Sequence, residues 1–204
     1  NQFSQIHETY YLDPMYPEAS IINNGFSSGF GAAVYAYNGG SPVQSIMNLS
    51  VKNTNPATST LAFNECDKGI ITIQSSLAAE NLYLDYVPMG ICNFSVLGNT
   101  TAGYHVKNNK LYNTHIGMQF EGGDKANSEV LGNTISCSLY PYAVSTGVPG
   151  SYIWPKGISV SYFNNGSINA FAISDQNQIT LPQYAGIGIN ALNGGSGLAI
   201  KNNT

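Results

Sequence analysis

The residues best suited to acid–base chemistry are predicted to lie together on one face of a β-sheet. Side chains alternate along a strand, so the neighbours of inward-pointing apolar residues point outward and stack about 4.8 Å apart in successive strands. This alternation gathers a phenol, an imidazole, an amine and two carboxylates: Tyr83, Asp85, His105, Lys107 and Glu129. Histidine or lysine could carry a proton there, with the carboxylates as tuning partners. A solvated face with ion pairs is the favoured alternative, because opposite charges are common cross-strand neighbours.

Other groups of reactive residues give weaker signals. His105 and His115 are expected to point outward from different sides of one coil, so they form no pair. Calcium could bind two acidic pairs near turns, but two carboxylates each would hold it weakly: Glu65/Asp67 and Glu121/Asp124. No other cofactor or metal is expected. The cysteines lack metal-binding spacing and permit at most one disulfide, which favours buried thiols: Cys66, Cys92 and Cys137.

Aromatic residues cluster in one segment near 138–155, "SLYPYAVSTGVPGSYIWP". A long loop on a rigid scaffold is a frequent carrier of function. Its rings could form a platform for sugars or a protein partner, or could cover the flank of the fold: Tyr140, Tyr142, Tyr152 and Trp154.

The elements that carry these residues are predicted to be short β-strands in a repeat. Apolar pairs spaced i, i+2 form two series. The first recurs at steps of 22, 23, 22, 42 and 29 residues, and each member of the second follows its partner by 10 to 13 residues. The first series is Leu49/Val51, Ile71/Ile73, Phe94/Val96, Ile116/Met118, Ile158/Val160 and Ile187/Ile189. The second is Leu61/Phe63, Leu82/Leu84, Tyr104/Val106, Val130, Phe171/Ile173 and Leu198/Ile200. Two series in constant phase favour a solenoid, whose coils must stack their apolar residues.

Outward neighbours in the first series are small and nearly neutral. They predict a flat face that is hydrated or lies against a polysaccharide or subunit: Ser50, Thr72, Ser95, Gly117, Ser159 and Gly188.

The turn sequences agree with a solenoid. "VKNNKL" (106–111) and "VLGNTI" (130–135) both have Asn three residues after the inward residue, and "ISDQNQI" (173–179) has one extra residue. Asn tolerates left-handed backbone, and stacked Asn side chains can hydrogen-bond from coil to coil. These motifs resemble the right-handed parallel β-helix of pectate-lyase-like enzymes, phage tailspikes and bacterial surface proteins. The resemblance implies an all-β solenoid of about six coils with one long loop insertion, and it leaves function open because that superfamily includes enzymes and adhesins.

The resemblance covers residues 46–204, and residues 1–45 are expected to form an N-terminal arm and cap. "GLAIKNNT" at 197–204 ends as a coil enters its turn, which predicts either further chain or another subunit at this end. Repeated head-to-tail contacts of that kind would give a filament.

Composition limits the partners. Charged residues make up 9%, the formal net charge is −4, and seven dispersed lysines without arginine provide no basic surface for nucleic acid. No apolar run is long enough to span a membrane, and the N-terminal residues suggest a mature secreted chain or an excised fragment. Four sequons would accept glycans in a secretory pathway: Asn48, Asn93, Asn99 and Asn165.

The sequence therefore predicts a secreted or cell-surface β-solenoid that acts without chemistry, as a structural or adhesive protein. Its expected partners are a polysaccharide or cell-surface glycan, and further copies of itself through the coil ends. The alternative is a polysaccharide-active enzyme, a lyase or glycoside hydrolase, or a fragment of one. Lack of arginine and of an Asp-Asp pair is unlike the catalytic residues of pectate lyases and polygalacturonase-like hydrolases, respectively.

Overall fold

The computed structural model describes thirteen parts of the chain: residues 3–4, 32–37, 47–53, 63–94, 103–122, 128–138, 144–145, 152–161, 172–174, 177–183, 186–192, 199–200 and 203. All regular secondary structure in these ranges is β-strand. None of the described residues forms a helix of the length and apolarity needed to cross a membrane.

Eighteen of the strands form three parallel sheets of six strands each. Sheet 1 contains β2 (Ala32–Tyr37), β5 (Lys68–Ile73), β8 (Met89–Phe94), β11 (Ile116–Glu121), β16 (Lys156–Ser161) and β19 (Ile187–Leu192). Sheet 2 contains β3 (Met47–Lys52), β6 (Ser75–Glu80), β9 (Tyr104–Lys107), β12 (Glu129–Leu131), β17 (Ala172–Ser174) and β20 (Ala199–Ile200). Sheet 3 contains β1 (Phe3–Ser4), β4 (Phe63–Asn64), β7 (Tyr83–Asp85), β10 (Lys110–Thr114), β13 (Thr134–Cys137) and β18 (Gln178–Thr180).

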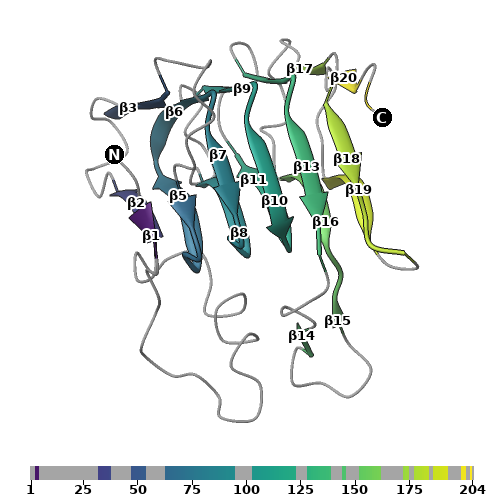
Figure 1. Cartoon of the computed structure of the whole chain (residues 1–204). Coiled ribbons are helices and arrows are strands. Elements are labelled where there is room, and N and C mark those ends of the chain that lie inside the picture. The colour runs from purple at the N-terminus through teal and green to yellow at the C-terminus, as the bar shows by residue number, and fades with distance from the viewer. Residues whose placement is uncertain are drawn as a thin grey trace.

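The chain visits the sheets in rotation, so each strand pairs with the strand one coil away. Figure 1 shows the coils stacked in order from the purple N-terminal strands to the yellow C-terminal strands. The fold is a parallel β-solenoid of about five to six coils, as the repeats predict. Because β2 is the first strand of sheet 1, residues before 46 take part in the stack.

A short antiparallel pair interrupts the rotation between β13 and β16. Its strands are β14 (Val144–Ser145) and β15 (Tyr152–Ile153), and they lie apart from the three sheets in Figure 1. This is the segment where the sequence predicts the insertion.

The core lies between the three sheets, which form the three walls of the solenoid. Inward side chains of successive coils stack in ladders along each wall. Sheet 1 contributes a ladder of Ile70, Ile91, Met118 and Ile158, all fully buried. Sheets 2 and 3 contribute fully buried residues such as Tyr104, Val106, Val130, Leu84, Leu111 and Ile135. Each such side chain contributes about 1.5–3 kcal/mol of transfer free energy on burial, so stacking of coils stabilises the fold.

The second residue of β5, β8, β11, β16 and β19 in sheet 1 is glycine, and these glycines stack in a column that lets successive coils approach closely. It contains Gly69, Gly90, Gly117, Gly157 and Gly188. A Cβ on Gly117 would lie 2.6 Å from the Ile135 side chain and 2.7 Å from the carbonyl oxygen of Gly157. These distances exclude a side chain at this position without local movement.

An asparagine ladder crosses the corner between sheets 2 and 3. Asn109, Asn133 and Asn177 are fully buried. The backbone N and the side-chain Nδ2 of Asn109 both donate to Asn133 Oδ1, and those of Asn133 both donate to Asn177 Oδ1, at 2.9–3.0 Å. Asn177 Nδ2 continues the ladder to Asn203 Oδ1 at 2.9 Å. The prediction of stacked Asn side chains is confirmed, although the left-handed residue is the preceding one, for example Asn108 with φ 55°.

The two predicted apolar series are wrong in detail, because the solenoid has three walls. Leu49/Val51 aligns with Leu77/Ala79 and then with Tyr104/Val106 in sheet 2, whereas Phe63 and Leu84 belong to sheet 3. Each predicted series combines residues of different sheets, because strands of all three sheets carry similar apolar residues and spacing alone does not distinguish them.

Several predicted inward residues in sheet 1 lie on its outer face. Ile71 and Phe94 belong to a second buried cluster outside the main core, with Met89 and Cys92, and Ile116 aligns with Met89. Ser159 on the same face is 3% exposed, while Thr72 points inward and donates to the Cys92 carbonyl. The prediction of a flat, hydrated outer face is therefore wrong. Both faces of the middle strands of this sheet are buried, so alternation does not identify the inner one.

Candidate functional site

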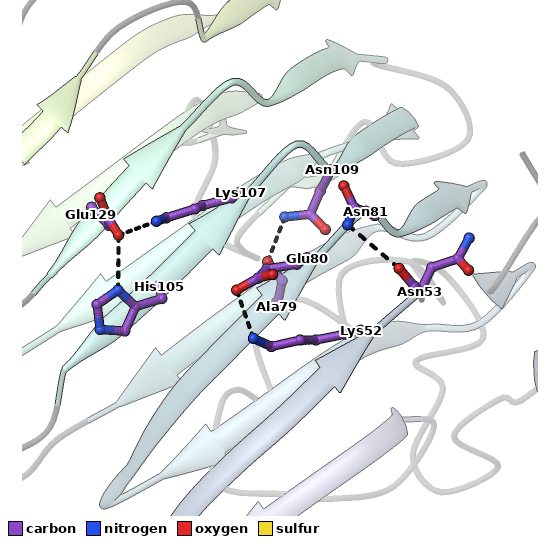
Figure 2. A network of polar contacts seen from close by, with 9 residues as sticks. All are labelled: Lys52, Asn53, Ala79, Glu80, Asn81, His105, Lys107, Asn109 and Glu129. Carbon is purple, nitrogen blue, oxygen red and sulfur yellow. Dashed lines mark hydrogen bonds and ion pairs between the residues drawn. The ribbon is translucent and has the colours of Figure 1, made fainter. Parts of the chain in front are cut away.

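Three of the five candidate acid–base residues meet on the outer face of sheet 2. His105 and Glu129 are direct neighbours in the strand register, and Lys107 lies two residues along β9. His105 Nδ1 is 3.0 Å from Glu129 Oε1, and Lys107 Nζ contacts the same oxygen. Figure 2 shows both cationic side chains converging on the carboxylate.

The carboxylate is the electrostatic centre of this cluster. The bond from Lys107 holds the pKa of Glu129 below its ordinary value, the bond from His105 acts in the same direction, and partial burial opposes both. Each side chain stays partly exposed: 32% of Lys107 and Glu129, and 44% of His105. The arrangement keeps Glu129 ionised and orients the imidazole.

A second ion pair lies on the same face. Lys52 Nζ on β3 is 2.8 Å from Glu80 Oε1 on β6, and Glu80 aligns with Lys107 on β9. Figure 2 shows the two groups side by side on the translucent strands. Sheet 2 thus carries alternating charges across four coils, as an exposed sheet with cross-strand ion pairs should.

The other two candidates, Tyr83 and Asp85, do not belong to this cluster. They lie on β7 in sheet 3, where their register partners are Lys110 and Tyr112. The sheet 2 neighbour of His105 is instead Ala78. The prediction of a single five-residue face is therefore wrong, because Leu84 lies in sheet 3 whereas Val106 lies in sheet 2.

On the outer face of sheet 3, Tyr83 and Asp85 form a different group that sequence reasoning did not predict. The rings of Tyr83 and Tyr112 lie 5.4 Å apart between centroids, with planes tilted by 51°. Asn113 Nδ2 donates to Asp85 Oδ1 at 2.8 Å. We call Tyr83, Asp85, Tyr112 and Asn113 the tyrosine patch. Alternation around Leu111 would have found Tyr112 had the third wall been recognised.

Burial raises the pKa of Tyr83, and the neighbouring Asp85 and Tyr112 raise it further. The phenol therefore stays neutral at physiological pH and can both donate and accept a hydrogen bond. The tilted rings supply apolar surface, and the carboxylate–amide pair supplies oriented polar groups. This combination of an aromatic face with a polar edge suits recognition of a neutral polar ligand.

The candidates in the inserted segment are described only in part. Trp154 is 47% exposed, just before β16. Tyr152 belongs to β15, but its side chain lies outside the described structure, as do Tyr140 and Tyr142. The predicted aromatic platform therefore stays a prediction.

His115 is fully buried at the corner between sheets 3 and 1, so the prediction that it points outward is wrong. Its backbone amide donates to the Pro88 carbonyl at 3.0 Å, and its carbonyl accepts from Lys156 N. His115 is the single residue between β10 of sheet 3 and β11 of sheet 1, and its side chain lies inside the corner that these two strands form. It does not join His105, which lies on sheet 2.

One of the four sequons is inaccessible in the folded protein. Asn93 is fully buried in β8, and its Nδ2 donates to the Ser75 carbonyl at 2.7 Å. It occupies a buried inward position of sheet 1, aligned with Thr72 and Phe120, so the prediction that it is a surface glycan acceptor is wrong. Asn48 lies in β3 with its side chain undescribed, and Asn99 and Asn165 lie outside the described residues.

The two predicted acidic pairs are described only in part. Asp67 is buried while Glu65 is exposed, and Glu121 Oε1 accepts from Gln119 Nε2 at 2.9 Å. Asp124 lies outside the described residues. In the part of the chain that the structure describes, no three His, Cys, Asp or Glu residues are grouped to hold a metal ion.

The three cysteines are buried, as expected: Cys66, Cys92 and Cys137. Burial raises the pKa of Cys137 to about 12 and that of Cys92 still more. Thiols with such values are protonated near neutral pH and are poor nucleophiles.

No family model matches the chain, and neither a curated protein nor a solved structure is significantly similar to it. The likeness to parallel β-helix proteins therefore rests on the three parallel sheets and their strand rotation.

Proposed function

We propose that the protein is a non-catalytic, extracellular structural or adhesive β-solenoid of the right-handed parallel β-helix type, and that it binds polysaccharide or cell-surface glycan. The observation that carries the proposal is the tyrosine patch on sheet 3. Its paired rings lie beside a hydrogen-bonded carboxylate and amide on an outer face.

The chemistry of the patch matches that of a sugar. A pyranose ring has an apolar C–H face, which packs on an aromatic ring, and hydroxyl groups around its rim. Tyr83 and Tyr112 would supply the rings, while Asp85 and Asn113 would bond hydroxyl groups. Because β7 and β10 are held in register by the coil stack, the patch needs little ordering on binding.

Trp154 is the second candidate contact. It is exposed at 47% and follows β15 in the insertion, where the sequence predicts a glycan platform. A glycan chain could contact this residue in addition to the tyrosine patch or in place of it, so the two contacts need separate variants.

Retention on a panel of insoluble polysaccharides tests the proposal. We expect the wild type to be retained by at least one member and the double variant Tyr83→Ala/Tyr112→Ala to lose most of that retention. Tyr35→Ala removes an exposed tyrosine on sheet 1, away from the tyrosine patch, and is the matched control. Trp154→Ala measures the contribution of the insertion. No retention of the wild type by any polysaccharide would contradict the proposal.

The polysaccharide-active enzyme is the second candidate. The observation that favours it is the His105–Glu129 contact at 3.0 Å, an oriented imidazole on an accessible face. Release of soluble sugars from the same panel tests it, with His105→Ala as the comparison. Release that disappears in His105→Ala would favour the enzyme over the binding protein.

A further inference from the structure

The carboxylate of Asp85 in the tyrosine patch differs from the carboxylates of sheet 2, because no described lysine or histidine forms an ion pair with it. On sheet 2, Glu80 and Glu129 each contact a cationic side chain. Asp85 Oδ1 instead accepts from two neutral donors, Asn113 Nδ2 at 2.8 Å and the backbone N of Tyr86 at 3.0 Å. Within the described part of the chain, the patch therefore carries a negative charge without a counter-ion.

The two bonds to Oδ1 orient the carboxylate and leave its other oxygen for a ligand. Tyr86 follows Asp85 in the chain, and Asn113 follows Tyr112, the register partner of Asp85 on β10. Oδ2 accepts from no described residue. An ionised carboxylate has about four acceptor positions and no donor of its own. A ligand group that approaches Asp85 must therefore donate a hydrogen bond.

The rings of Tyr83 and Tyr112 provide a second attraction for positive charge. Tyr83 lies two residues before Asp85 on β7, so both side chains share the outer face of sheet 3 with Tyr112. The ring centroids are 5.4 Å apart and the planes are tilted by 51°. The face of an aromatic ring attracts an ammonium group that lies within about 6 Å of the centroid. A cation bonded to Asp85 can thus also contact a tyrosine ring.

The charge of Asp85 acts on the neighbouring ring. Burial raises the pKa of Tyr83 most, the charge of Asp85 raises this pKa next, and Tyr112 raises it further. The carboxylate thus disfavours a second negative charge at the phenol. The same Coulomb interaction favours a positive charge there.

Two charged side chains flank the patch, and their charges oppose each other. Lys110 is exposed and aligns with Tyr83. Glu65 is exposed on the other side of β7, and its backbone N donates to the Asp85 carbonyl at 3.1 Å. Because one flanking charge is positive and the other negative, Asp85 determines the sign of the charge at the patch.

We infer that the tyrosine patch prefers a glycan whose sugars carry a protonated amino group, such as a polymer of glucosamine, over neutral and acidic glycans. The inference rests on the proposed glycan binding and names the class of glycan. A neutral sugar would match the rings and the amide, but a cationic sugar would also compensate Asp85. Its ammonium replaces one hydroxyl at the rim, so the C–H face can pack on a tyrosine while the ammonium donates to the carboxylate.

Calorimetric titration with two oligomers of equal length tests the inference, one of β-linked glucosamine and one of β-linked N-acetylglucosamine, at a pH at which the free amine is protonated. The acetyl group removes the charge and keeps the sugar ring. We expect wild-type protein to bind the glucosamine oligomer about tenfold more tightly, equivalent to about 1.4 kcal/mol, as for one hydrogen bond to a charged group. A tenfold rise in ionic strength shortens the Debye length about threefold and should weaken the binding of this oligomer alone.

Three variants locate the preference. Asp85→Asn removes the charge and keeps an oxygen that can accept the bonds from Asn113 and Tyr86, so the two oligomers should then bind within about twofold of each other. Glu80→Gln removes the same charge from sheet 2 and should keep the preference, which controls for the net charge of the chain. Lys110→Gln removes the flanking positive charge and should strengthen binding of the glucosamine oligomer about twofold.

Equal affinity of the wild type for the two oligomers, or a preference that persists in Asp85→Asn, would overturn the inference. An oligolysine of equal charge that binds as tightly as the glucosamine oligomer would also overturn it, because the patch would then recognise a basic peptide.

Retention on the polysaccharide panel separates this inference from the proposed function. Stronger retention by a neutral or acidic polysaccharide, lost in Tyr83→Ala/Tyr112→Ala, would contradict only the preference for amino sugars. Retention by no polysaccharide would contradict the glycan proposal as well.

Discussion

At the scale of single residues, Glu129 has the most specific electrostatic role. It accepts from both His105 and Lys107, whereas Glu80 on the same face pairs only with Lys52 in the described structure. The sequence predicted the His105–Glu129 and Lys107–Glu129 neighbours correctly because both strands lie in sheet 2. It did not separate Tyr83 and Asp85 from them, because period-2 alternation carries no information about which wall a strand joins.

Replacing Glu129 with Gln should lower the free energy of unfolding by about 0.5–1 kcal/mol at pH 7, a discounted figure for a partly exposed pair. The pKa of Glu129 in the folded protein lies below the ordinary value of 4.5. Its stabilisation is therefore present above about pH 4.5 and is lost as the pH falls through the folded-state pKa. Urea unfolding of both proteins from pH 7 to pH 2.5 measures this.

Glu80→Gln is the matched control, since it removes one ion pair from the same sheet, and its effect at pH 7 should be smaller. A difference between wild type and Glu129→Gln that stays constant over the whole pH range would show that the carboxylate charge is not what stabilises the cluster.

At the scale of elements, the corners and strand starts hold the coils together. The Asn at the corner between sheets 2 and 3 could be predicted, because "VKNN" and "VLGN" repeat its spacing from an inward valine. The glycine column could also have been found, since Lys-Gly-Ile occurs at 68–70 and 156–158. Alternation does not reveal this column, because the register passes directly from Lys68↔Met89 to Ile70↔Ile91 and the alternation of inward and outward residues changes at the glycine.

Asn133→Leu tests the ladder. Leucine fits the space, because Leu82 occupies the equivalent corner below Asn109 and its amide bonds Asn109 Oδ1 at 3.0 Å. The variant nevertheless removes the acceptor of Asn109 N and Nδ2 and the donor to the Val106 carbonyl. We expect a loss of about 3 kcal/mol or more, since each buried unsatisfied group costs about 1–3 kcal/mol.

Chemical denaturation of Asn133→Leu beside Asn190→Ala gives the comparison. Asn190 makes one bond, to Ser159 Oγ at 3.2 Å, on the outer face of the last sheet 1 strand. Its removal should cost about 1 kcal/mol or less. Equal losses in the two variants would mean that the buried ladder contributes no more than an ordinary surface amide.

At the scale of the whole molecule, the repeated inward residues determine the fold, whereas the function depends on side chains of the outer faces. Apolar residues recurring about every 22 residues predicted a solenoid, because stacked coils are the arrangement that buries such repeats continuously. Function is less accessible to this reasoning. The tyrosine patch joins residues from β7 and β10, and their proximity depends on a register that the third wall sets.

The most direct test of the account is titration of the soluble form of a retained glycan into monomeric protein by calorimetry. Tyr83→Ala and Tyr112→Ala should each raise the Kd about tenfold, equivalent to about 1.4 kcal/mol, because each removes one ring of the platform. Tyr35→Ala on sheet 1 should change the Kd less than twofold. Unchanged affinity in both patch variants, with melting temperatures equal to that of the wild type, would contradict glycan binding by sheet 3.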